Sequence, residues 1–481
     1  MPIATTGTLA VVVVTTASGR QAEGIAATVE GRTLTIQGDD AVRFDSLSPG
    51  NHTVRIGPTA AHCFAAAETV GALVHVGATD TAVVKLYCIG GMAFHEQVGN
   101  QDYQVSYLDE TGRKVRLTRD PGINFVEEWS PDGSRLLLGR WLGDSKQLYS
   151  VRADGTDFKQ LTSGPYFHTR PRWSPDGRRI AFYRWAGQST GFTKSMSVIV
   201  MDADGANKRV LLDATHVDFD PVWSTDGSEL YFTCNRFDPN WNLCAITPEG
   251  TGLRRIRYAA VEALDVAPPC TADICVRIGS GAQHWEMSPD GSSISFMTIF
   301  SPSDGPQAMW VGALDGSSAT VLTPGTPSFD LDWAPDGRRA LISIADEKGG
   351  FALLTAKRDG SEPKQFSDYA NRDESGRWSP DGALIAFDAF RSGRQEVWVA
   401  NPDGTGARPF LSGLAPTFRP FWNPRLRSNV ALPLSLGASA ARFAPERSLA
   451  REAASAGAAP LQRGECLVTP QGIAARVDCM P

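Results

Sequence analysis

Short runs of alternating hydrophobic and polar residues cover the first 90 positions of the chain. A period of two is typical of strands with one buried face, and closely spaced short strands are typical of two packed sheets. Residues 1–90 are therefore predicted to form a small Ig-like β-sandwich. The runs, separated by turns rich in Gly, Asp and Pro, are 8–14, 25–29, 33–36, 42–44, 52–56, 73–76 and 81–87.

The apolar run at 9–14 is far shorter than the about 20 residues that a membrane-spanning helix needs. It also lacks the basic residues and the small-residue cleavage site of a signal peptide. We interpret it as a strand, and expect neither a transmembrane segment nor a signal peptide in this chain.

From residue 91 onward the pattern becomes a long repeat, in which Trp-Ser-Pro-Asp-Gly or a close variant precedes each short apolar strand. The copies begin at Trp129, Trp173, Trp223, Met287, Trp333, Trp378 and, as a shortened Trp-Asn-Pro, at Trp422. Their spacings of 44, 50, 64, 46, 45 and 44 residues match the four-stranded blade of a β-propeller. The spacing of 64 indicates an insertion in one blade.

The two ends of the repeat region complement each other. Residues 92–118 contain the last three strands of a repeat without the first, and residues 419–424 contain a first strand alone. Joined, they make a composite blade that leaves no exposed sheet edge. We predict an all-β fold in which 91–426 form a seven-bladed propeller closed by this blade. Six blades is the alternative, if 250–285 build no full blade.

The repeated motif has the chemistry of a turn: Pro fixes φ, Asp hydrogen-bonds nearby backbone, and Gly tolerates positive φ. Its Trp is expected to pack between blades. The repeat resembles the TolB-like (PD40, WD40-like) propeller family over about residues 90–425. That family includes envelope proteins that dock partners, propeller halves of serine peptidases and metal-dependent sugar lyases. Residues 44–54 are similar to a turn of carboxypeptidase-regulatory-like modules, which are spacers in surface proteins.

Composition and cysteine content narrow the setting. A net charge of −7 on 481 residues, with no concentrated basic segment, argues against a nucleic-acid partner. Eight cysteines form four neighbouring pairs: 63 with 88, 234 with 244, 270 with 275, and 466 with 479. Such pairs indicate disulfides, and so a periplasmic, cell-surface or secreted location. Reduced core thiols in a cytosolic protein are the alternative.

Residues 427–481 are predicted to be an Ala- and Pro-rich extension that contains a hairpin closed by Cys466 and Cys479. It either caps the propeller or makes contacts with another molecule. A propeller-linked serine hydrolase needs a further α/β domain that carries a strand-to-helix nucleophile elbow, and the chain has no such segment beside the repeats, so no serine hydrolase site is expected and no catalytic residue is assigned.

A metal site is the sharper enzymatic hypothesis. His168, His216 and His284 precede the motif position of successive repeats by five, seven and three residues, which would bring them near one channel mouth. Three imidazoles suit a transition metal. Carboxylates in the same connections suggest calcium or a basic peptide instead, but solvated loop charge is favoured because Arg170, Arg172 and Arg377 occupy equivalent places. These carboxylates are Glu127, Glu128, Asp218, Asp220, Asp330, Asp332, Asp373 and Glu374.

The sequence therefore favours an extracytoplasmic binding scaffold with no cofactor. Its partner is expected to be a protein or a glycan at the cell envelope, with self-association as one version. The alternative is a metal-dependent polysaccharide lyase or hydrolase that uses the channel mouth.

Overall fold

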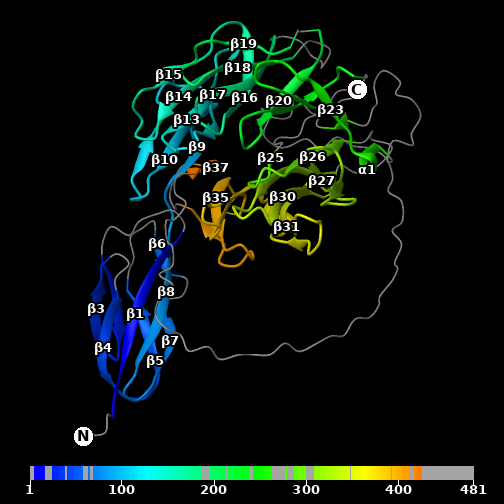
Figure 1. Ribbon diagram of the computed structural model, residues 1–481. Helices are drawn as coiled ribbons and strands as arrows, with labels where there is room; N and C mark the ends of the chain where they lie inside the picture. The colour runs from blue at the N-terminus through cyan, green and yellow to red at the C-terminus, as the bar shows by residue number, and fades with distance from the viewer. Residues whose placement is uncertain are drawn as a thin grey trace, which may run out of the picture.

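A computed structural model describes residues 5–424 apart from short gaps. The gaps are 17–23, 38–40, 58–62, 66–68, 187–195, 213–214, 238–241, 263–276, 279–285, 300–307, 347, 392 and 411–415. Strands make up almost all of the regular structure between them, which confirms the all-β class (Figure 1). The helices described are α1 (Ala259–Glu262) and the 3-10 helix η1 (Tyr369–Asn371), and no described helix is long and apolar enough to cross a bilayer.

Two four-stranded sheets at the N-terminal end enclose one hydrophobic core that includes Val11, Phe44 and Leu86. A disulfide between Cys63 and Cys88 joins neighbouring strands of the first sheet. In sheet order, the first contains β4 (Ala41–Leu47), β1 (Gly7–Thr16), β8 (Thr79–Cys88) and β6 (Cys63–Ala65). The second contains β3 (Arg32–Ile36), β2 (Ile25–Val29), β5 (Gly50–Ile56) and β7 (Thr69–Val74).

The remaining strands form antiparallel units that follow the sequence repeat. Unit 1 contains β12 (Asn124–Trp129), β13 (Arg135–Trp141), β14 (Lys146–Arg152) and β15 (Lys159–Gln160). Unit 2 contains β16 (Tyr166–Trp173), β17 (Arg179–Ala186), β18 (Ser197–Asp202) and β19 (Arg209–Val210). Unit 3 contains β20 (Asp218–Trp223), β21 (Leu230–Cys234), β22 (Asn242–Ile246) and β23 (Arg254–Ile256).

Unit 4 is the irregular one, with β24 (Arg277–Ile278), β25 (Glu286–Met287), β26 (Ser293–Ile299), β27 (Ala308–Ala313) and β28 (Ala319–Val321). Unit 5 contains β29 (Ser328–Trp333), β30 (Arg339–Ala345), β31 (Phe351–Lys357) and β32 (Lys364–Gln365). Unit 6 contains β33 (Glu374–Trp378), β34 (Ile385–Ala389), β35 (Glu396–Ala400) and β36 (Arg408–Pro409). The number of blades stays a prediction, because much of the chain around unit 4 lies outside the described residues.

The closing unit joins distant parts of the chain. It contains β37 (Thr417–Trp422), β9 (Met92–Gly99), β10 (Asp102–Leu108) and β11 (Lys114–Arg116), with β37 antiparallel to β9. The first strands of consecutive units also lie next to one another in a closed series, from β12 through β16, β20, β25, β29 and β33 to β37 and back to β12. These strands therefore form the inner wall of the ring.

Each motif folds into the same turn. In unit 1, Ser130 Oγ donates to Asp132 Oδ1 at 2.6 Å, and the Gly133 N–H donates to the Ser130 carbonyl at 2.7 Å. Gly133 has a φ of 65°, a conformation that favours glycine. The serine–aspartate hydrogen bond recurs at Ser174, Ser224, Ser288 and Ser379.

The motif tryptophans are buried between units, as expected for core residues. The indole Nε1 of Trp129 donates to the Phe421 carbonyl of the preceding unit at 3.2 Å. Trp223 and Trp422 make the same contact to the preceding unit, with carbonyl oxygens of Arg172 and Arg377 at 3.0 and 3.2 Å. Because the Trp ring also fills the space between sheets, one side chain fixes both packing and register of adjacent units.

We expect Gly312→Ala to destabilise the protein. A Cβ at Gly312 would lie 2.4 Å from the Tyr258 ring, which is buried, stacked on Phe296 and hydrogen-bonded to the Ala313 carbonyl. Overpacking at such a site costs about 1–3 kcal/mol. Gly99→Ala is the matched strand control, since its Cβ would meet only Asp102 Cβ, at 3.4 Å. Urea unfolding of both variants checks this, and equal midpoints would contradict the packing described.

Candidate functional site

The residue before the motif position is charged in five of the seven repeats, and these charges interact between units. Arg172 of unit 2 contacts Glu286 of unit 4 at 3.0 Å and Glu128 of unit 1 at 3.1 Å. Unit 3 separates units 2 and 4 along the ring, so the contact with Glu286 crosses the channel. The equivalent residues, which we call the channel ring, are Glu128, Arg172, Val222, Glu286, Asp332, Arg377 and Phe421.

A second arginine of the channel ring is also paired. Arg377 Nη1 lies 2.9 Å from Asp330 Oδ2, and its guanidinium is 5.8 Å from the centre of the Phe421 ring. Burial alone would lower the pKa of Arg377, but the charges of Asp330, Asp332 and Glu286 outweigh it and raise that pKa. Glu286 therefore acts on both arginines, and the channel at this level is filled by interacting charges.

Two carboxyls of the channel ring also bind the backbone of the next unit. Glu128 Oε2 accepts the Trp173 N–H at 2.6 Å, and Asp332 Oδ2 accepts the Trp378 N–H at 2.7 Å. Burial raises the pKa of Glu128 to about 7 although Arg172 opposes the shift. Burial likewise raises the pKa of Asp332 to about 7 against the pull of Arg377. Protons therefore enter and leave this network near neutral pH.

The inner strands are locally strained in a way that the sequence interpretation missed. Arg170, Asp220 and Arg419 have φ values of 48°, 54° and 52°, and each precedes a proline. This left-handed conformation is unfavourable for residues with a Cβ, and most of all before proline. Each lies three residues before the motif Trp, so the recurring X-Pro at that spacing was a readable signal. The bend lets Arg170 reach Asp220 of the next unit at 3.0 Å.

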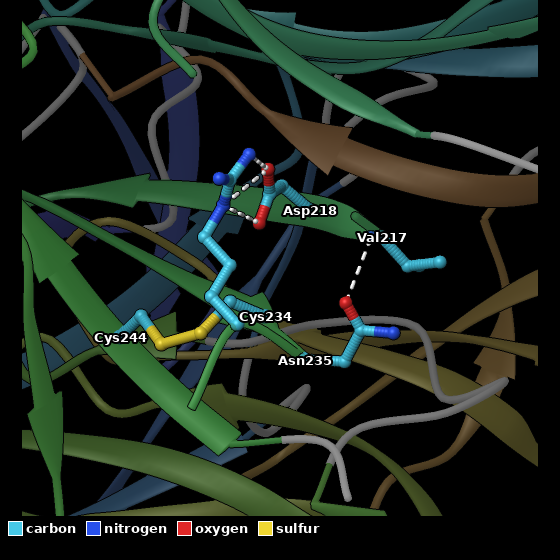
Figure 2. Close-up of a disulfide and its surroundings, with 6 residues drawn as sticks. Val217, Asp218, Cys234, Asn235 and Cys244 are labelled. Atoms are coloured by element: carbon cyan, nitrogen blue, oxygen red, sulfur yellow. Dashed lines mark hydrogen bonds and ion pairs between the residues drawn. A yellow bond between two sulfur atoms is a disulfide. The ribbon is translucent and has the colours of Figure 1, made fainter. Parts of the chain in front are cut away.

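Ion pairs hold two hairpins against the inner strands, each at the turn between the second and third strands of its unit. Arg236, after β21, donates to both carboxylate oxygens of Asp218 at the start of β20, with donor–acceptor distances of 2.6–3.0 Å; Asp218 is labelled in Figure 2. Arg391, after β34, pairs in the same way with Asp373, just before β33. Both carboxyls are fully buried. We call these contacts the tip ion pairs.

In unit 3 the same tip has two further restraints. A disulfide links Cys234 of β21 to Cys244 of β22, and Asn235 Oδ1 accepts the Val217 N–H at 2.9 Å (Figure 2). The tip is thereby held to its own hairpin and to the inner strand. This disulfide and that between Cys63 and Cys88 confirm two of the predicted pairings. The other four cysteines lie outside the described residues.

Exposed apolar side chains gather at these tips. The turns between the second and third strands, which we call the tips, lie on the same face of the propeller as the starts of the inner strands. We call this face the hairpin face. Most of the large hydrophobic residues exposed in the described propeller lie at or beside such a tip. The residues at the tips are Val98, Leu142, Phe237 and Phe390, and 42–48% of each is exposed. The tips therefore present apolar groups on a rigid base.

The interpretation of the eight carboxylates as solvated loop charge is wrong. Four of them, Asp218, Asp220, Asp330 and Asp373, are buried and each pairs with an arginine. The arginines expected to dilute an acidic rim are instead partners of the carboxylates. Strand bulges bring the two signs together, and a sequence gives no direct sign of that.

Two of the three candidate metal ligands lie within the described residues. His168 is buried on β16, with Nδ1 at 3.2 Å from the Lys146 carbonyl, and His216 Nδ1 lies 2.7 Å from Thr215 Oγ1. His284 lies outside the described residues. Among those described, no three His, Cys, Asp or Glu side chains group closely enough to hold a metal ion. The metal site stays a prediction.

No family model matches the chain. An uncharacterized protein of Agrobacterium fabrum is 28% identical over 187 residues, which are 38% of this chain and 58% of that protein. The Tol-Pal system protein TolB of Anaeromyxobacter dehalogenans is 32% identical over 114 residues, 22% of this chain. The chain spans only 24% of that TolB. The propeller is TolB-like.

Solved structures similar to the TolB-like propeller include a putative TolB from Agrobacterium tumefaciens, with a TM-score of 0.38 and 18% identity. That match covers 53% of this chain and 84% of the other. Another is an oligogalacturonate lyase from Vibrio parahaemolyticus, with a TM-score of 0.47 and 13% identity, covering 62% of this chain and 83% of the other.

The raised pKa values of Glu128 and Asp332 predict a loss of stability as pH rises. In the unfolded chain these carboxyls ionise near pH 4, and in the folded protein near 7. Their contribution to the free energy of unfolding is complete below the pKa of the unfolded state and is lost as the pH rises through the pKa of the folded state. We expect the free energy of unfolding to fall by about 1–3 kcal/mol between about pH 5 and 8.

A Glu128→Gln, Asp332→Asn variant keeps the acceptors for both backbone N–H groups and removes both titrations. Its free energy of unfolding should vary less over the same pH range. Glu249→Gln, which changes a carboxyl that is 62% exposed, should leave the slope unchanged. Urea titrations at several pH values measure this. A variant as pH-dependent as the natural chain would show that these carboxyls ionise normally.

Proposed function

We propose that the protein is a binding scaffold outside the cytoplasm, at the cell envelope, and that a partner protein docks on the hairpin face. The observation that carries the proposal is the set of exposed apolar tips on the hairpin face, with Phe237 and Phe390 beside the tip ion pairs. Aromatic side chains on a rigid base are favourable binding anchors, because little conformational entropy is lost when they are buried.

The restraints on the tips support this proposal. Phe237 directly follows Arg236, which is fixed to Asp218, and it lies in the loop closed by the Cys234–Cys244 disulfide. Phe390 directly precedes Arg391, which is fixed to Asp373. Each phenylalanine is therefore exposed next to a backbone position held by a buried ion pair. Flexible surface loops would have to be ordered during binding, at a cost in affinity.

Location and partner class rest on two further supports. The disulfides suit an oxidising compartment outside the cytoplasm. The relative with 32% identity is named as a protein of the Tol-Pal system, which favours a protein as partner. The proposal assigns no catalytic residue and no cofactor.

Capture from envelope extract, followed by affinity measurement with the purified partner, tests the proposal. Phe237→Ser, Phe390→Ser is the test variant. Leu34→Ser, Leu73→Ser is the matched control, because these leucines are equally apolar and exposed on the N-terminal sheets. We expect the test variant to bind at least about tenfold more weakly, since central aromatic anchors contribute more than about 1 kcal/mol each. Equal binding by natural chain and test variant would overturn the docking site.

A further inference from the structure

A small polar cavity lies between units 1 and 2, separate from the tips on the hairpin face. Its volume is about 180 Å³, and the polar side chains that line it are Thr162, Ser163, His168, Arg184, Lys208 and Arg209. Thr162 and Ser163 follow the last strand of unit 1, and the other four come from three strands or strand ends of unit 2. With about 30 Å³ for each water molecule, the cavity has room for a small hydrated ion.

Three cations of the cavity have no carboxylate partner among the described residues. The Arg184 guanidinium lies over the Tyr166 ring at 4.6 Å. Lys208 Nζ and Arg209 Nη2 donate to the carbonyl oxygens of Gly205 and Pro248. None of the three forms an ion pair in the described part of the chain. Arg172 and Arg377 of the channel, in contrast, are each paired with a carboxylate.

His168 shows that the positive charge extends into the cavity. It is 4% exposed, and its Nδ1 contacts the Lys146 carbonyl, so that nitrogen carries the proton of the neutral ring. Burial, together with the charges of Arg184 and Lys208, lowers the pKa of His168 to about 4 against the opposing hydrogen bond to Lys146. A bound anion would offset those two charges and raise the pKa of His168.

We propose that this cavity binds a phosphate or sulfate group. A guanidinium presents a planar pair of donors that matches two oxygens of such a group, and the Lys208 ammonium adds a point charge. Ser163 is exposed at the cavity and supplies a hydroxyl donor. Lys208 and Arg209 are exposed at the mouth, so the group can arrive as a free ion or as the end of a larger phosphorylated or sulfated molecule. The site uses none of the tip residues, and it stands independently of the proposed docking surface.

Calorimetric titration of the full chain with inorganic phosphate tests the proposal, with sodium chloride adjusted to constant ionic strength. The test variant is Arg184→Gln, Lys208→Gln. The matched control is Arg178→Gln, Lys348→Gln, which removes two exposed cations that lie on turns outside the cavity. We expect phosphate to bind saturably to the natural chain and to the control. The test variant should bind phosphate about tenfold more weakly or worse. Lys208→Gln alone, at an exposed position, serves if the double variant does not fold.

Two further titrants distinguish the sources. Sulfate should compete with phosphate, and glycerol phosphate should bind as well as inorganic phosphate if the open mouth admits a monoester. Weaker binding of glycerol phosphate would restrict the site to the free ion. NMR titration of His168 should show its pKa rising when phosphate is added. Absence of saturable phosphate binding, or equal binding by natural chain and test variant, would overturn the proposal.

Discussion

The antiparallel pairing of β37 with β9 is the constraint on which the rest of the structure depends. It joins Trp422 to Met92 and brings the end of the repeat region to its beginning. Without it, β9 would expose one hydrogen-bonding edge, and unit 1 would lose the Phe421 carbonyl that Trp129 binds. With it, the first strands follow one another in a closed series, and their side chains share one channel. Arg172 of unit 2 and Glu286 of unit 4, for example, meet at this inner wall.

The same few positions stabilise the ring and shape its channel. The motif Trp fills the space between units, and at Trp129, Trp173, Trp223, Trp378 and Trp422 either the indole N–H or the backbone N–H binds the unit before it. The carboxyls of Glu128 and Asp332 accept the backbone N–H of the next motif Trp, and each also feels the charge of a channel arginine. Buried charges of this kind contribute little net stability, but they penalise misplaced partners strongly. They specify which unit lies next to which.

Much of the fold could be predicted from the sequence because it repeats. The turn Ser130–Gly133 and the Trp before it recur with the same hydrogen bonds, so that one copy explains the others. The candidate site is different, because its contacts join residues that do not repeat regularly. Asp218 and Arg236 lie 18 residues apart across a hairpin, as Asp373 and Arg391 do in unit 6. The sequence shows the charges there, but only the folded hairpin decides that they are buried and paired rather than solvated. The cavity beside His168 depends similarly on Arg184 and Lys208, which are 24 positions apart in the sequence and line one cavity only in the folded unit.

Hydrogen exchange of the intact protein tests ring closure most directly. If β37 is an integral strand of the closing unit, its amides should exchange as slowly as those of β9 and β33, through the same global unfolding. Mass spectrometry of peptides that cover 417–422 and 92–99 would then give matching protection. Rapid exchange of β37 while β9 stays protected would show that the ring opens at this strand, and would contradict a propeller whose units are held together by its closure.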